Sequence, residues 1–209
     1  MARTTYPGAE HYLPERLSLP ALRAAAASCH GCPLYKDTTQ TVFGAGRRSA
    51  RLMLVGEQPG DAEDKAGKPF VGPAGRLLAQ AVEAAGLSPL ELYITNVVKH
   101  FKHETRGGRR FHKTPKRAEV DACEPWIEAE LAVVKPEVLV CLGATAAQGL
   151  LGSKVRVTVD RGRDLPTPLA PHAVVTIHPS LVLRQQSSED RRRELAGLTA
   201  DLAFAASLL

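Results

Sequence analysis

Four short apolar segments, separated by stretches of helical character, constrain the fold more than any other feature of this sequence. The segments are 51–57, 92–98, 137–143 and 173–178, and each ends in polar or glycine-containing residues. We expect helices at 72–85, 116–134, 144–151 and 188–208. Strands that are apolar throughout and alternate with helices are typical of a parallel sheet covered on both faces. The sequence therefore predicts an α/β fold, a three-layer α/β/α sandwich with a four-stranded parallel sheet.

The chain has 209 residues, which suits a single domain at 1–209 and is short for two. Its N-terminal segment contains an expected helix at 19–28 that packs outside the sheet unit, next to a pair of cysteines. The apolar runs are too short to cross a bilayer, and the first ten residues lack the regions of a signal peptide. We therefore expect a cytoplasmic monomer with no membrane contact.

The positive charge of the chain is concentrated in one segment. The formal net charge is +5, yet residues 99–117 contain eight Lys or Arg and a single acidic residue. Such a cluster is the electrostatic pattern expected of a protein that binds a phosphate backbone. The alternative is a solvated loop without a partner, because charge runs often serve only as solvated surface.

The spacing of the cysteines points to metal or redox chemistry. Cys29 and Cys32 form a CxxC motif, which fits a redox dithiol, a zinc site or an iron–sulfur cluster. The motif follows an Ala-rich helix, which weakens a thioredoxin-like role. A closed metal site needs two further ligands, and we expect Cys123 and His100 to supply them. Cys141 lies within an apolar strand, where a free cysteine usually acts as a small hydrophobe.

Polar side chains at the ends of the expected strands indicate where the chemistry takes place. In open parallel sheets, ligands bind beyond the carboxyl ends of the strands. Glu57, Gln58, Asn96 and His178 all fall at this edge, and Phe70 precedes a helix start beside it. An aromatic ring and an amide could stack on and read a flipped nucleobase there. Taken alone, such a phenylalanine is more often a core residue, and a lone histidine is often only a satisfied polar group.

Two nucleotide-binding signatures are excluded. The glycines around Lys68 are spaced too widely for a phosphate-binding loop, and Pro69 follows where a hydroxyl residue is required. The glycines at 44–46 precede the first strand instead of following it, so they are not a dinucleotide fingerprint.

Four sequence blocks together resemble the family-4 uracil-DNA glycosylases. The blocks are Gly-Glu-Gln-Pro-Gly-Asp-Ala-Glu-Asp at 56–64, Pro-Phe-Val-Gly-Pro-Ala-Gly-Arg-Leu-Leu at 69–78, Tyr-Ile-Thr-Asn-Val-Val-Lys at 93–99, and His-Pro-Ser at 178–180. The resemblance covers nearly the whole chain. Order, spacing and position agree, which makes the combination highly specific.

Two further features resemble the UdgX branch of that family. Gln58 stands where the hydrolytic relatives usually have a small residue, and the basic loop at 107–113 is similar to the Lys-Arg-Arg-Ile-His loop of the branch. The resemblance assigns the covalent nucleophile of that loop to His112. The loop departs from the pattern at Gly108, which replaces Lys, and at Phe111, which replaces Ile.

The resemblance also implies roles for the other residues and a substrate, uracil-containing DNA, including single-stranded DNA, with uracil as product. Phe70 would stack on uracil, Asn96 would read its N3 and O4 edge, and His178 would donate to O2. Glu57 and Gln58 would face the sugar, where His112 would attack C1′. Further expected contacts are Gly56 and Asp61 in the substrate pocket, and Arg109, Arg110, Lys113, Ser180 and Arg184 along the DNA. The implied cofactor is a [4Fe-4S] cluster held by Cys29, Cys32, His100 and Cys123.

Two alternatives to covalent capture remain open at this point. The first is a turnover glycosylase that releases a free abasic site. The second is a non-catalytic sensor that binds uracil or abasic DNA through the same pocket.

Overall fold

The sheet expected from the four apolar segments is present in the structure, a computed structural model that describes residues 5–209. Its parallel strands are β2 (Leu52–Gly56), β3 (Leu92–Asn96), β6 (Val138–Leu142) and β7 (His172–Thr176). A two-residue strand, β1 (Ala45–Gly46), adds antiparallel to the β3 edge, so the sheet has five strands in the order β1-β3-β2-β6-β7 instead of the four expected.

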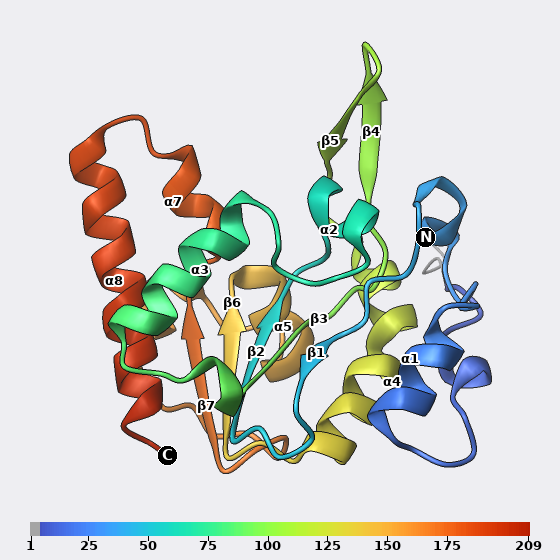
Figure 1. The fold of residues 1–209 in the computed structure, drawn as a ribbon, viewed down its shortest axis with the longest axis horizontal. Helices are drawn as coiled ribbons and strands as arrows, with labels where there is room; N and C mark the ends of the chain where they lie inside the picture. The colour runs from blue at the N-terminus through green and yellow to red at the C-terminus, as the bar shows by residue number, and fades with distance from the viewer. Residues whose placement is uncertain (1–4) are drawn as a thin grey trace.

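Helices cover both faces of this sheet, as the three-layer prediction requires (Figure 1). One face carries α3 (Pro73–Ala84) and α8 (Ser188–Ala206), and the other carries α4 (Arg117–Val134) and α5 (Ala144–Leu151), with α1 (Leu19–Ala26) packed on α4. Successive side chains of a strand point to opposite faces. Met53 and Val55 accordingly join the core under α4, while Leu52 and Leu54 join the core under α3 and α8.

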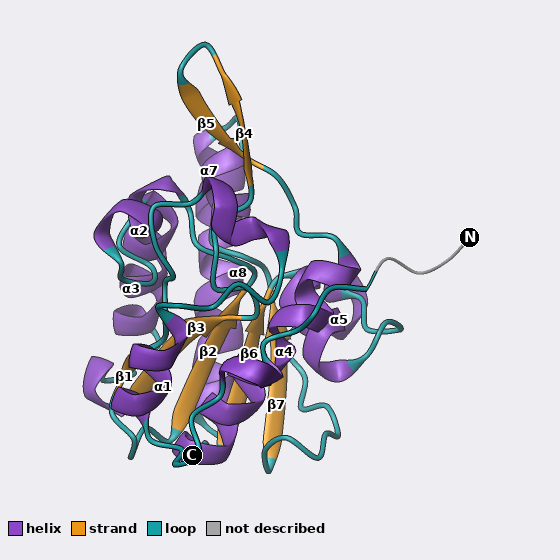
Figure 2. Ribbon diagram, turned by 90° about the vertical axis from the view of Figure 1, so that its right-hand side faces the viewer, coloured by secondary structure: helices purple, strands orange, loops and turns teal. Residues whose placement is uncertain are grey.

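The strand order places a topological switch point at the carboxyl end of β2. From β2 the chain crosses to β3 on one side, whereas from β6 it crosses to β7 on the other. The helices that follow β2 and β6, α3 and α5, consequently lie on opposite faces (Figure 2). A crevice opens between the two strand ends in such sheets, and it is the usual ligand site.

Several short helices were not expected from the sequence. They are α2 (Asp61–Ala66), α6 (Val157–Asp160), α7 (Ser180–Arg184) and the 3₁₀ turns Glu10–Tyr12, Pro33–Asp37 and Pro89–Glu91. Each spans six residues or fewer, which is too short to show the 3.6-residue periodicity of a helix. Within residues 5–209, no helix combines the length and apolar composition needed to cross a membrane.

The basic segment expected to form a loop is a β-hairpin. Strand β4 (His103–Arg106) pairs antiparallel with β5 (Arg109–His112), and the hairpin projects beyond the carboxyl edge of the sheet (Figure 1). The turn is Gly107-Gly108, with φ of +54° and +75°. Positive φ at both central residues suits the right-handed twist of a two-residue hairpin, and glycine adopts it without steric cost.

Candidate active site

A cavity of about 410 Å³ opens at the carboxyl edge of the sheet, beneath the hairpin. It brings together eight residues singled out from the sequence, namely Glu57, Gln58, Phe70, Asn96, His112, His178, Ser180 and Arg184. Gly60, Glu63, Ala74 and Thr114 complete its lining. The lining residues come from five separate parts of the chain, so only the fold can assemble them.

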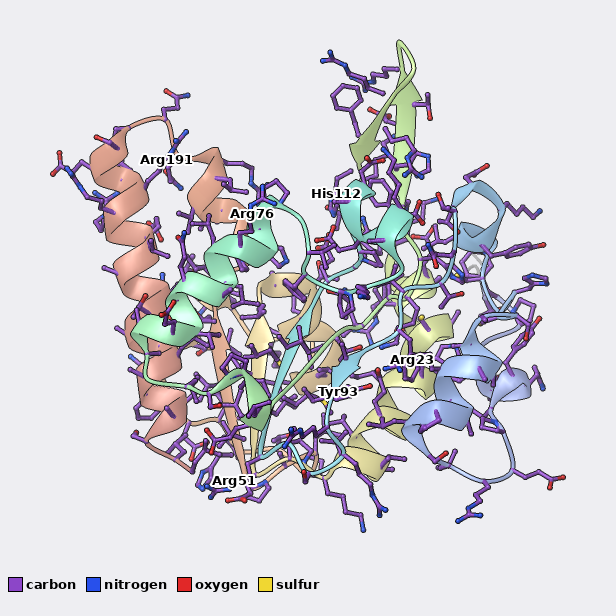
Figure 3. The ribbon with its side chains drawn as sticks, in the orientation of Figure 1. Arg23, Arg51, Arg76, Tyr93, His112 and Arg191 are labelled. Atoms are coloured by element: carbon purple, nitrogen blue, oxygen red, sulfur yellow. The ribbon has the colours of Figure 1, made fainter. Side chains whose placement is uncertain are left out.

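Glu57 and His112 are in direct contact across the cavity. His112 Nε2 lies 3.0 Å from Glu57 Oε1, and the side chains are 49% and 20% exposed. The other carboxylate oxygen, Oε2, accepts a hydrogen bond from the hydroxyl of Thr145. Burial opposes ionisation of Glu57, but the contacts with His112 and Thr145 outweigh it and lower the pKa of the carboxyl. Glu57 is therefore held as a carboxylate beside an imidazole that faces the cavity. Figure 3 shows His112 at the base of the hairpin.

Gln58 fastens the hairpin to the body of the protein. Its Nε2 donates to Lys102 O at 3.1 Å and to Lys113 O at 3.0 Å, and its Oε1 accepts from Lys102 N at 2.9 Å. The side chain is buried. The sequence interpretation placed Gln58 on the sugar side, as a polar group for the reaction. In the structure its amide is committed to the two ends of the hairpin, so it acts on the site by fixing where β5 carries His112.

Arg110 makes a second connection between the hairpin and the body. Its Nε lies 2.6 Å from Asp61 Oδ1, and its Nη1 lies 2.6 Å from Asp64 Oδ2. Arg110 was expected to contact phosphate and Asp61 to contact substrate. The structure instead pairs them with each other, so the charge of Arg110 is balanced within the protein and Asp61 lies outside the cavity lining.

Side chains along β5 point alternately to opposite faces of the hairpin, which explains why neighbouring residues have different partners. Arg110 and His112 share the face of the hairpin that meets α2 and the cavity, whereas Arg109 and Phe111 lie on the other face. Arg109 is exposed and has no ion-pair partner among residues 5–209. Lys113 is 54% exposed and pairs with Glu104 at 2.7 Å. Arg109 is thus the hairpin residue best placed to meet a phosphate.

His178 is held as a neutral ring. The backbone N–H of Ser180 donates to its Nδ1 at 3.2 Å, so Nδ1 acts as an acceptor and the ring proton resides on Nε2. Burial lowers the pKa of His178 from 6.5 to about 4, against the opposing effect of Glu57. A neutral imidazole with Nε2–H available can donate a hydrogen bond within the cavity.

Phe70, Gly56 and Asn96 form a narrow slot. A Cβ placed on Gly56 would lie 2.6 Å from Phe70 Cζ and would also clash with Asn96 Oδ1. Phe70 has a φ of +54°, a conformation that side chains rarely adopt. Glu63 supports this turn by accepting from Gly60 N at 3.1 Å and Gly72 N at 2.7 Å. Gly56 therefore allows Phe70 and Asn96 to pack closely at the end of β2, and the slot is the part of the cavity that these two side chains line. Gly56, expected from the sequence to contact the substrate, is not among the lining residues.

Asn96 is rigidly positioned, yet its amide oxygen has no partner. The residue is 2% exposed, and Oδ1 is buried without a hydrogen bond to any part of residues 5–209. Its backbone carbonyl accepts from Lys99 Nζ at 2.8 Å, and Lys99 forms a buried ion pair with Glu130. An unpaired buried acceptor is costly, so Oδ1 marks a place where a ligand donor would be stabilised.

Three of the expected cluster ligands gather away from the cavity. Cys29, Cys32 and Cys123 are buried and free of disulfides. Burial raises the pKa of Cys32 to about 11 and of Cys123 to about 12, and the nearby Cys29 adds to both rises. Trp126 Nε1 donates to Cys29 Sγ at 3.3 Å. These thiols share one environment between the N-terminal segment and α4.

His100 is buried nearby, but its Nε2 is hydrogen bonded to Thr41 Oγ1 at 2.9 Å. Burial lowers the pKa of His100 to about 4 and so keeps the ring neutral. Cys141 is fully buried within β6, as expected of a small hydrophobe. Across residues 5–209, no three His, Cys, Asp or Glu side chains converge closely enough to hold a single metal ion.

The sequence interpretation missed Thr145, Glu63 and Asp64, which hold the site without reacting. Thr145 stands in the Gly-Ala-Thr signature after β6, a strand-end motif noted without a role. Glu63 and Asp64 fall inside the block at 56–64 that carries the resemblance. Apart from Gly60, which lies beside Glu63, their partners lie 9 to 88 positions away in the chain, a separation that local patterns do not report.

The parallel sheet with helices on both faces defines an α/β protein. The cavity at its switch point contains an aromatic ring, amide groups and two imidazoles, which is typical of an enzyme active site. Comparison with known proteins identifies the family. Residues 43–203 match the family described as the uracil DNA glycosylase superfamily, and the chain belongs to it.

Two relatives from other organisms align with most of this chain. The type-4 uracil-DNA glycosylase of Thermotoga maritima is 39% identical over 177 residues, which cover 84% of this chain and 88% of that protein. The type-4 uracil-DNA glycosylase of Pyrobaculum aerophilum is 35% identical over 176 residues, which cover 81% of this chain and 86% of that protein. Both alignments agree with the family resemblance read from the four sequence blocks.

Proposed function

We propose that this chain excises uracil from DNA and that His112 then captures the sugar, giving a covalent protein–DNA adduct. The observation that carries the proposal is the 3.0 Å contact between His112 Nε2 and Glu57 Oε1 at the cavity. It pairs a nucleophile with a group that can accept its proton, the arrangement that covalent catalysis requires. Family membership and the type-4 relatives support the substrate.

Uracil is the base that the slot fits. Phe70 offers an aromatic face for stacking, and the unpaired Oδ1 of Asn96 can accept the N3–H of uracil. The buried position of Asn96 makes this hydrogen bond selective, because a base without a donor there would leave Oδ1 unpaired. Gly56 allows Phe70 and Asn96 to stand in these positions, because a Cβ there would collide with both side chains.

Cleavage of the glycosidic bond places negative charge on uracil and positive charge on the sugar. The electron pair of the bond leaves with uracil N1, and the charge spreads onto O2. His178 can donate its Nε2–H to that oxygen from a ring that stays neutral. The carboxylate of Glu57 lies on the same cavity wall and favours the developing cation of the sugar.

Capture by His112 completes the reaction without a further reagent. The unprotonated ring nitrogen of His112 supplies the electron pair that bonds to C1′, and the proton on its other ring nitrogen passes to Glu57. The alkylated imidazole is then neutral, and the uracil anion takes up through solvent the proton that Glu57 received, so that uracil leaves neutral and Glu57 is again a carboxylate. Because the histidine is consumed, each protein molecule reacts once.

We also propose a [4Fe-4S] cluster between the N-terminal segment and α4. The donor set fits, since Cys29, Cys32 and Cys123 are buried free thiols and N–H groups of Trp126 and Lys99 point at two of the sulfurs. His100 would complete the set in place of its bond to Thr41. The cluster would supply thiolate–iron bonds that tie the N-terminal segment to α4.

The test is a denaturing gel with a single-stranded oligonucleotide that contains one uracil. The proposal predicts a band shifted by the mass of the protein that survives heat and denaturant, with peptide mapping that places the link on His112. His112→Ala should lose the shifted band and still cleave uracil, leaving an alkali-labile site. His172→Ala is the matched control, because that imidazole pairs with Asp164 at the start of β7.

Three other outcomes would replace the proposal. An alkali-labile site without a shifted band for the wild-type protein identifies a turnover glycosylase. Binding without either product identifies a sensor of uracil or abasic DNA. A link that maps to Lys113 and needs borohydride to persist would assign a different nucleophile.

A further inference from the structure

The turn between β6 and α5 lies behind the two reactive side chains and has no part in the cavity lining. Gly143, at its start, has a φ of +90°, and a Cβ added there would lie 2.9 Å from the Cβ of His178. Two residues further on, Thr145 bonds to Glu57. The turn therefore positions two side chains: Gly143 allows His178 to approach it closely, and Thr145 holds the carboxylate of Glu57.

The contact between Thr145 and Glu57 bridges the topological switch point. Glu57 follows β2, Thr145 lies in the first turn of α5 after β6, and the two strands are parallel neighbours. The Thr145 hydroxyl donates to Oε2 of Glu57, while Oε1 of the same carboxylate faces His112. Each carboxylate oxygen thus has its own partner, and the plane of the group is fixed from both sides.

We propose that Thr145 is a positioning residue whose hydroxyl occupies one oxygen of Glu57 so that the other is presented to His112. The inference rests on the proposed capture reaction and adds the group that orients its proton acceptor. A carboxylate held at one oxygen cannot rotate to offer both oxygens to water. The Thr145 hydroxyl therefore favours capture by His112 over attack by water at the same sugar carbon.

The hydrogen bond from the Thr145 hydroxyl also affects the pKa of Glu57, because the hydroxyl donates to the carboxylate form. Hydrogen bonds to a carboxylate lower its pKa, and both Thr145 and His112 do so here. The charged or titratable groups that face Glu57 are His112 from β5 and His178 after β7. Both stay in place when Thr145 is changed, so a change in the pKa of Glu57 reports the hydroxyl.

Thr145→Val tests the proposal, because valine keeps the shape of threonine and lacks the hydroxyl. Thr145→Ser keeps the hydroxyl and loses the methyl group. Thr199→Val is the matched control, since within residues 5–209 the Thr199 hydroxyl bonds only to Leu195 O in α8. For each variant, ¹³C-carboxyl NMR follows the titration of Glu57, assigned by its loss in Glu57→Gln, and the gel assay gives the ratio of adduct to free abasic site.

We expect Thr145→Val to raise the pKa of Glu57 and to slow adduct formation about tenfold, the usual scale of one hydrogen bond to a charged group. The share of free abasic site should rise as well. Thr145→Ser and Thr199→Val should match the wild-type protein in both measurements. If valine destabilises the fold, Thr145→Ala compared with Thr145→Ser provides the same contrast.

An unchanged pKa of Glu57 in Thr145→Val would overturn the inference. Equal losses in Thr145→Val and Thr145→Ser would also overturn it, because they would assign the effect to packing of the methyl group. If the wild-type protein formed no adduct, the capture reaction would fail, whereas the titration of Glu57 would still decide whether the Thr145 hydroxyl holds the carboxylate.

Discussion

The guanidinium of Arg110 on the hairpin reaches the carboxylate of Asp64 on α2, with 2.6 Å between Nη1 and Oδ2, and that carboxylate is fully buried. Arg110→Ala would leave Asp64 with hydrogen bonds from Thr39 N but without a counter-ion. Breaking such a pair leaves an uncompensated buried charge. We expect a loss of about 2–4 kcal/mol in the free energy of unfolding, measured by urea denaturation, together with a lower adduct yield.

Arg109→Ala is the control for this change, because Arg109 lies one position away on the opposite face of the hairpin. Its loss should leave the unfolding free energy within about 0.5 kcal/mol of the wild type. It should instead reduce the slope of log K against log salt for DNA binding by about one, the value for one phosphate contact. An unchanged slope would show that this face of the hairpin is only a solvated surface.

Gly56→Ala should displace the side chains that line the slot without disturbing the basic hairpin. The added methyl group would meet Phe70 Cζ at 2.6 Å, and it would also clash with Asn96 Oδ1, so at least one of the two must move. We expect excision of uracil to fall by at least about 100-fold, since one of these walls would have to move. Binding of uracil-free single-stranded DNA, measured by fluorescence anisotropy, should stay unchanged. Full excision activity in this variant would contradict the placement of uracil between Phe70 and Asn96.

His178→Ala should weaken bond cleavage. The variant loses the donor to the charge that develops on the base, and removal of one such donor typically costs about 10²–10³ in rate. Single-turnover excision with saturating protein measures this step separately from binding. A variant in which only the binding constant changes would make His178 a recognition group.

His178 should also make the stability of the protein dependent on pH. Burial lowers its pKa from 6.5 to about 4, so between these values the unfolded chain binds a proton that the folded protein does not. The contribution is complete above pH 6.5 and declines as the pH falls towards 4. Between pH 7 and pH 5, the wild type should lose about 1–2 kcal/mol more than His178→Gln, as measured by denaturant unfolding. Equal losses would show that the ring is already protonated or fully solvated in the folded state.

Anaerobically purified protein should be brown and absorb at roughly 400 nm, as thiolate-bound iron does. Cys29→Ala, Cys32→Ala and Cys123→Ala should each bleach this colour, and His100→Ala should make it labile. Cys141→Ala should leave it intact, because that thiol is enclosed within β6. Full occupancy by zinc would refute the cluster.

The parallel sheet was predictable because its strands are buried on both faces, which makes each a continuous apolar run such as Val138–Leu142. The same pattern of strands also predicted that the cavity lies at the carboxyl edge of the sheet. The hairpin was not predicted, although Gly107-Gly108 between basic residues is a known turn signal. Its charge density instead favoured interpretation as a basic loop that binds a phosphate backbone.

The roles of Gln58 and Arg110 could not be predicted from residue type. A buried amide and an arginine suit a reaction and a phosphate contact equally well, and only the positions of Lys102, Lys113 and Asp64 decide between these functions. Those partners lie 44 to 55 positions from them in the chain. Function at this site depends on contacts that the fold creates between distant segments.

The hairpin that carries His112 closes on itself, since Lys113 N donates to Lys102 O at 3.0 Å and Gln58 binds both residues. Its entry and exit therefore meet at one point of the scaffold. A segment with coincident ends can be exchanged for a tighter turn without repacking the sheet. The ten residues between Lys102 and Lys113, fastened by one glutamine, therefore form a unit whose replacement by a tight turn would remove His112 from the cavity and leave the sheet intact.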